Sequence, residues 1–349
     1  SPLRVMDSKS FFAKMIMKNK INIKYILGLI LLLVFSTEVF PQTPCTKETA
    51  YQTIGKWGKP KMDDLAMADR SFPKTQYKPV LAKAQKVINL FMQAHPEFKG
   101  IEASAKRVIR GDSYLPNGAL PFGIDVWYPS YFCVGNDTAS VEMRGKVIIF
   151  SNYGYTSVTF NSLRNVLESV QDGSLFLTTE GEEIFGFNKQ LADFKGFTTI
   201  QPTTRDGEIH EAIIITPDNR LPYKPVTREQ FLQAKIKFLQ SQNQGGLFSK
   251  DITTLNSMIG NMSSAERQSA AIVRDITASP SRLFVPESAG GRHLVTIDKS
   301  FFNPKLPRET IQFITIHWHW NNQETPKVEA IRQFKQNFDF AALKQMLGK

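Results

Sequence analysis

Two histidines near the C-terminus come closest to a chemical motif. In the run His317-Trp-His-Trp320 the two residue types alternate, so on a β-strand His317 and His319 point to one face and the two tryptophans to the other. Such a pair of imidazoles can share a zinc ion, which needs a third and usually a fourth ligand from His210, His293 or a carboxylate. His317 and His319 are therefore the candidate metal ligands. The alternative is a strand end with one packed aromatic face and one half-exposed histidine face.

A serine motif resembles the nucleophile elbow of esterases. The run Pro286-Glu-Ser-Ala-Gly-Gly291 places Ser288 before two glycines. Pro286 stands where the elbow has its first glycine, and a proline ring obstructs the close backbone approach that the elbow needs. Asp298 and His317 could complete a serine–acid–histidine order, but no glycine-rich oxyanion loop precedes the serine. We interpret the motif as a turn between two strands and predict no catalytic residue.

Aromatic residues occupy several strand-like positions. A platform for stacking sugar rings could be built from them, although aromatic residues in strands more often belong to the core. No paired carboxylates stand at a spacing typical of glycosidases. The residues concerned are Trp127-Tyr128, Tyr131-Phe132, Tyr153, Tyr155, Trp318 and Trp320.

Cys45 and Cys133 are the only cysteines. In an exported chain they would meet an oxidising compartment, so we predict a disulfide that joins the start of the mature chain to the segment around Cys133. Two unpaired thiols are the alternative. A catalytic thiol is disfavoured because no basic residue adjoins Cys133 to lower its pKa.

The N-terminal region has the three parts of a signal peptide. Lysines between residues 14 and 24 precede the apolar run Ile26–Phe35, and polar residues follow it. Ten apolar residues cover about 15 Å as a helix, half the hydrocarbon thickness of a membrane. We therefore expect residues 1–42 to be upstream residues and a signal peptide, with no transmembrane segment in the mature chain. A lipid anchor at Cys45 is disfavoured because Gln42-Thr43-Pro44 are not small apolar residues.

Helical and strand-like patterns occur in separate runs along the chain. Apolar spacing predicts a helix from Pro79 to Pro96 and a second one from Thr227, where Gln230 completes a capping box. Ser263 and Glu266 form another capping box. Further helical pieces are expected over 252–262, 328–334 and 340–347, and strands over 107–110, 122–128, 146–153, 175–178, 184–187, 197–201, 209–216, 283–285, 293–297 and 311–320. The apolar runs 147–150 and 212–215 predict strands that are covered on both faces.

This order predicts an α+β fold, a mostly antiparallel sheet with flanking amphipathic helices in up to two subdomains. We expect a lead segment over 43–75, a first α+β domain over 76–243 and a C-terminal α+β region over 244–349, with a linker at 241–250. The formal net charge of +11 falls to +7 without residues 1–42, which carry six basic and two acidic side chains. The cations are scattered rather than gathered in a stripe, so a nucleic-acid partner is excluded.

One further set of residues carries a resemblance. Pro225-Val-Thr-Arg228, Phe231-Leu232, Phe301-Phe-Asn-Pro-Lys-Leu-Pro307 and Gln312–Ile316 resemble a group of exported bacterial proteins of unknown function, from about Lys78 to the C-terminus. The resemblance implies an exported α+β protein and no activity.

Function is predicted mainly from what is missing. Without a catalytic or cofactor motif, we favour a non-enzymatic periplasmic or extracellular protein that binds an envelope or glycan partner. The alternatives are a hydrolase, metal-dependent or otherwise, that uses His317 and His319, and a glycan-binding protein that uses exposed aromatics. Zinc is the cofactor that the histidine pair would take.

Overall fold

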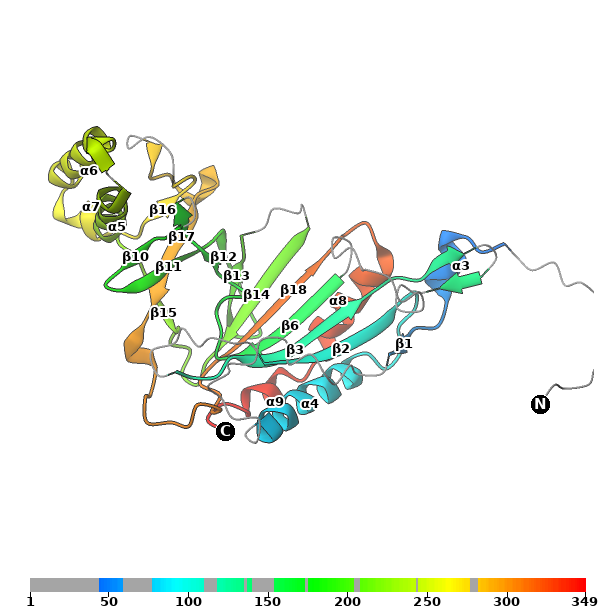
Figure 1. Ribbon diagram of the computed structural model, residues 1–349. Coiled ribbons are helices and arrows are strands. Elements are labelled where there is room, and N and C mark those ends of the chain that lie inside the picture. The colour runs from blue at the N-terminus through cyan, green and yellow to red at the C-terminus, as the bar shows by residue number, and fades with distance from the viewer. Residues whose placement is uncertain are drawn as a thin grey trace, which may run out of the picture. The chain divides into compact units, whose positions relative to one another are not determined.

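The protein has an α+β fold, as the sequence predicts (Figure 1). The computed structural model describes residues 44–58, 77–109, 118–134, 137–139, 154–172, 175–203, 208–242, 244–276 and 282–349. One compact unit, Thr46–Val134 with Thr138–Lys349, contains the two main sheets and the helices around them.

A large sheet organises the described residues. All its neighbouring strands pair antiparallel except the first two. In spatial order its eight strands are β1 (Lys56–Trp57), β2 (Glu102–Ile109), β3 (Phe122–Tyr128), β6 (Gly154–Phe160), β18 (Ile314–Trp320), β14 (Ile209–Ile215), β13 (Phe197–Gln201) and β12 (Lys189–Phe194). The strand that carries the histidine pair, β18, therefore lies in the interior of the sheet, between β6 and β14.

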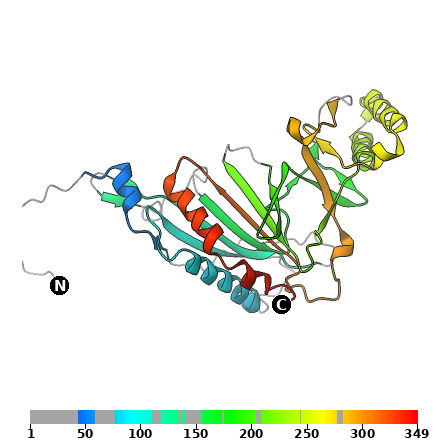
Figure 2. The same cartoon turned by 180° about the vertical axis from the view of Figure 1, so that it is seen from behind.

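Three helices pack on one face of this sheet, as Figures 1 and 2 show. They are α4 (Tyr77–Ala94), α8 (Thr325–Asn337) and α9 (Phe340–Lys344). The predicted apolar stripe of α4 is buried, and the Phe91 ring of that helix stacks on Phe334 of α8 with 5.0 Å between centroids. Trp318 of β18 lies 5.6 Å from the same Phe334 ring and is fully buried. This is the helix-covered face.

The opposite face carries the alternate residues of the same strands, among them His317 and His319; we call it the histidine face. Part of it, including Ile214 and Phe313, packs in an apolar cluster with Phe185 and Val295 of a second sheet.

That second sheet contains β10 (Thr178–Thr179), β11 (Glu182–Phe187), β17 (Arg292–Ile297) and β15 (Tyr223–Pro225), with β16 (Ile272–Val273) on β17 and β7 (Glu168–Ser169) on β11. A separate apolar cluster joins it to the helices α5 (Arg228–Gln242) and α6 (Ser249–Asn261), and α7 (Ser264–Gln268) lies beside α5. The smaller elements are α3 (Lys47–Gln52), the pair β4 (Phe132–Val134) and β5 (Asp137–Ala139), and the pair β8 (Gln171–Asp172) and β9 (Leu175–Phe176).

Both predicted capping boxes are present. The backbone N–H of Gln230 donates to Thr227 Oγ1 at 3.2 Å, and the N–H of Thr227 donates to Gln230 Oε1 at 2.9 Å. Ser263 and Glu266 make the same reciprocal pair at the start of α7. These short-range signals are reliable because both partners lie within one helical turn.

Several strands differ from the sequence prediction. β2 begins at Glu102, not at Arg107, because its first residues are small and polar and carry little β-propensity. The single strand predicted over 175–178 is two short strands, β9 and β10. The strand predicted over 283–285 is a single bridge between Phe284 and Val273.

Other strand predictions are confirmed. β3 and β13 have the predicted bounds, and Ala212–Ile215 is buried throughout, as expected of a strand that is covered on both faces. The expected strand over 146–153 lies outside the described residues.

The division at residue 243 remains a prediction. β18 comes from the expected C-terminal region, and its neighbours β6 and β14 come from the expected first domain, so both regions share one sheet.

The predicted disulfide between Cys45 and Cys133 is present. Within the described part of the chain, no helix is both long and apolar enough to cross a membrane. The expected signal peptide over 1–42 lies outside the described residues.

Candidate metal centre

Strand register brings three histidines together on the histidine face. His210 of β14 is the cross-strand partner of His319 on β18, and His317 lies two residues further along β18. The His210 and His319 rings stack almost parallel, with 4.7 Å between centroids and 6° between planes. The His210 and His317 ring centroids are 5.2 Å apart, with 25° between the ring planes. Three imidazoles from two adjacent strands thus form one cluster.

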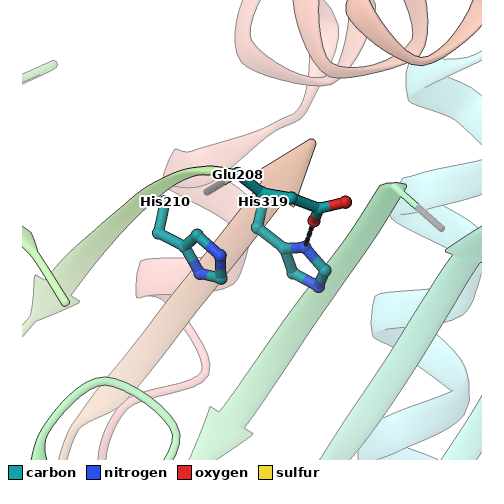
Figure 3. A group of neighbouring side chains, drawn as sticks. All are labelled: Glu208, His210 and His319. Atoms are coloured by element: carbon teal, nitrogen blue, oxygen red, sulfur yellow. Dashed lines mark hydrogen bonds and ion pairs between the residues drawn. The ribbon is translucent and has the colours of Figure 1, made fainter. Parts of the chain in front are cut away.

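A carboxylate completes this cluster. Glu208 stands two residues before His210, and its Oε2 accepts a hydrogen bond from His319 Nδ1 at 2.5 Å (Figure 3). One ligand-type atom each from Glu208, His210 and His319 lies within 4.8 Å of the others. The group is shielded from water: the Glu208 and His319 side chains are 7% and 17% exposed, and His210 is 8% exposed.

His317 supports the cluster from within the sheet. Its Nε2 lies 3.0 Å from His210 Nδ1, so one of the two nitrogens donates a hydrogen bond to the other. Burial, followed by the neighbouring charges of His319 and His210, holds the pKa of His317 well below its usual value. A neutral His317 that occupies His210 Nδ1 leaves His210 Nε2 as the nitrogen that can bind a metal.

A second polar group adjoins the histidines on the same face. Asp125 of β3 is 9% exposed, and its Oδ1 accepts hydrogen bonds from Tyr155 at 2.6 Å and from Ser157 at 2.9 Å. The Tyr155 ring in turn lies 5.3 Å from the His319 ring. Buried acidic and hydroxyl groups are costly unless they are hydrogen-bonded, and here they extend the polar surface across two further strands.

The donor set suits a transition-metal ion. Two imidazoles with one carboxylate bind zinc in hydrolases and Fe(II) in oxygenases. Two ligand atoms of one zinc ion are about 3.4 Å apart, given tetrahedral bonds of about 2.1 Å. Because Glu208 and His319 are only 2.5 Å apart, their hydrogen bond must open before both can bind through these two atoms.

The structure places the predicted site residues in two groups. His317 and His319 share a face, as the alternation predicts, and His210 joins them. His293 does not, since it lies on β17, bonds to Glu287 and stacks on Phe187. Whether a metal binds remains a prediction.

Sequence reasoning missed Glu208. A signal was present, because Glu208 and His210 have the same i, i+2 spacing as the histidine pair. The sequence alone does not reveal the register between β14 and β18, which places the Glu208–His210 pair beside the His317–His319 pair.

The remaining motifs do not form a site among the described residues. Residues 287–289 form a single 3-10 turn that ends at Gly290 in the left-handed conformation, which agrees with the predicted turn. The Asp298 carboxylate caps another turn by accepting from Ser300. Tyr128, Tyr131 and Trp318 are buried in the core, Trp127, Tyr155, Phe132 and Trp320 are half-buried, and Tyr153 lies outside the described residues.

No protein-family model matches the chain, and no curated protein or solved structure matches it significantly. The functional argument therefore rests on the site itself.

Proposed function

We propose that the protein binds a transition-metal ion, zinc foremost, through Glu208, His210 and His319, and that the bound ion serves hydrolysis. The observation that carries the proposal is the convergence of these three donor groups within 4.8 Å on one sheet face. Catalytic zinc sites have three protein ligands and a water molecule, whereas structural sites have four protein ligands. This proposal takes the hydrolase alternative of the sequence analysis and changes its ligands: His210 and Glu208 join His319, and His317 orients His210.

The chemistry follows from the ion. Zinc lowers the pKa of a bound water molecule to about 7, so that hydroxide is available near neutral pH, and it polarises carbonyl groups as a Lewis acid. Fe(II) would use the same donor set for oxygen chemistry. Metal analysis of the purified protein separates these outcomes.

The protein is also proposed to be exported, to the periplasm or the extracellular space. The disulfide between Cys45 and Cys133 supports this location, because disulfides persist in oxidising compartments. The tripartite pattern of residues 1–42 supports it independently.

Metal binding is tested on the full chain after dialysis against a weak chelator. We expect about one zinc per chain by elemental analysis and loss of that zinc in the His210→Ala, His319→Ala double variant. His293→Ala is the matched control, since His293 also bonds a glutamate at 2.5 Å but lies outside the cluster. Equal zinc content in wild type and double variant would refute the site. Stoichiometric iron in place of zinc would identify Fe(II) as the bound ion.

Hydrolysis is tested with p-nitrophenyl acetate, a chromogenic ester. The zinc-loaded chain should release p-nitrophenol faster than the zinc-free chain, and the double variant should not respond to zinc. Zinc binding without any metal-dependent hydrolysis would contradict the hydrolytic part and favour a binding protein.

A further inference from the structure

A row of four rings crosses four adjacent strands of the histidine face. Register aligns Trp127 of β3 with Tyr155 of β6, Tyr155 with His319, and His319 with His210. Successive ring centroids are 6.0, 5.3 and 4.7 Å apart. The proposed metal centre occupies one end of this row, and an indole ring the other.

The two aromatic rings at the far end of the row from the proposed metal centre are less buried than core aromatics. Trp127 and Tyr155 are half-buried, whereas Trp318, on the helix-covered face of the same sheet, is fully buried. Large aromatic rings that a fold leaves partly open next to convergent polar groups are typical of ligand sites.

A polar row runs parallel to the ring row. The register continues from Lys106 through Asp125 and Ser157 to His317. Tyr155 and Ser157 both donate to Asp125 Oδ1, which fixes the tyrosine hydroxyl beside the ring row. A ligand on this face would therefore meet the flat rings of Trp127 and Tyr155. Two residues away along the strands lies the polar row, in which Lys106 is half-buried, Asp125 is 9% exposed and Ser157 is buried.

We infer that the ligand of this face is a carbohydrate, which lies across β3, β6 and β18 with sugar rings on Trp127 and Tyr155 and one end at the proposed metal centre. This inference rests on the proposed function and names its substrate class. A sugar presents an apolar ring face and a hydroxyl edge, which matches the two rows. The cations of the chain are scattered rather than gathered in a stripe, which disfavours a nucleic acid. A purely apolar ligand would leave the Asp125 group facing hydrocarbon.

Isothermal titration calorimetry of the zinc-loaded full chain tests this with three soluble probes: chitotetraose, cellotetraose and maltotetraose. We expect saturable binding of at least one. Trp127→Ala should weaken that binding by about tenfold or more, the usual loss when a stacking ring is removed, whereas Trp127→Phe should retain it within about threefold because a flat ring remains. Trp320→Ala, on the helix-covered face, is the matched control and should bind as wild type.

The outcomes separate the two proposals. If no probe binds at millimolar concentration, or if Trp127→Ala binds as wild type while its thermal unfolding is unchanged, the carbohydrate inference is wrong even when zinc binds. If a probe binds and depends on Trp127 in protein that takes up no metal, the carbohydrate inference holds and the metal proposal fails. Should the alanine variant not fold, Trp127→Leu replaces it, because leucine keeps an apolar side chain without the flat ring and should weaken binding by about tenfold as well. Binding of Trp127→Leu as tight as wild type would likewise overturn the carbohydrate inference.

Discussion

At the scale of single residues, the main question is how Glu208 contributes. It is held 2.5 Å from His319 Nδ1, a hydrogen bond that could orient the imidazole so that Nε2 faces a metal ion. The same carboxylate lies close enough to His210 and His319 to be a ligand itself. A ligand supplies a metal bond and a negative charge, whereas an orienting group supplies only a hydrogen bond. Removal of a ligand should therefore lower the zinc affinity more than removal of an orienting group.

We expect Glu208→Gln to weaken zinc binding by more than about 100-fold, because loss of an orienting partner alone costs about 10- to 100-fold. Competition titration against a chromophoric zinc chelator measures the affinity. Glu287→Gln, which alters the other histidine–glutamate pair, should leave it unchanged. A loss of about 10- to 100-fold would make Glu208 an orienting group rather than a ligand, and a loss of less than about tenfold would remove it from both roles.

The part of the site that could be predicted is the part set by local geometry. His317 and His319 share a face because strand side chains alternate, and that holds without knowledge of the fold. The meeting of His210 with His319 depends instead on strands about 100 residues apart pairing in one register. Register is fixed by the burial of whole strand faces, which a single sequence does not reveal.

At the scale of elements, the His95 ring contacts backbone carbonyls of both α4 and α8. It follows the last residue of α4 and is 2% exposed, with Nδ1 2.9 Å from the carbonyl oxygen of Phe91 and Nε2 3.0 Å from that of Ala330. Burial lowers the pKa of His95, although the two carbonyl contacts oppose the shift. Two carbonyl acceptors favour the charged ring, because a neutral ring can donate to only one of them. The pKa is nevertheless lowered, since burial outweighs the two contacts.

This lowered pKa predicts a pH-dependent stability. Below pH about 6.5 the unfolded chain takes up a proton at His95 before the folded chain does. The stability contribution is therefore complete above that pH and declines as the pH falls toward the folded-state pKa. In chelator-treated protein, urea unfolding between pH 7 and pH 5 should show a steeper loss of unfolding free energy for wild type than for His95→Gln. Parallel curves would show that His95 does not titrate differently on folding.

At the scale of the whole molecule, the fold class was predictable from the sequence, but the spatial order of the strands in the sheet was not. The helical spacing of residues 80–92 and the apolar run Ala212–Ile215 each determine an element type through local periodicity. The position of β18 between β6 and β14 required contacts between distant segments, which composition and periodicity do not encode. Local signals therefore gave α+β, and long-range pairing gave the sheet and the cluster on its histidine face.

The disulfide contributes to the stability of the whole fold, and this contribution can be measured. Cys45 and Cys133 close a loop of nearly 90 residues, and restriction of the unfolded chain then stabilises the fold by about 4 to 5 kcal/mol in the chain-entropy model. We expect the Cys45→Ser, Cys133→Ser double variant to lose up to that amount of unfolding free energy in urea titrations. Reducing agent should lower the stability of wild type to a similar level and leave the variant unaffected, which controls for the loss of the cysteine side chains. A thiol assay on denatured, unreduced protein should find no free thiol, and two free thiols would contradict the bridge.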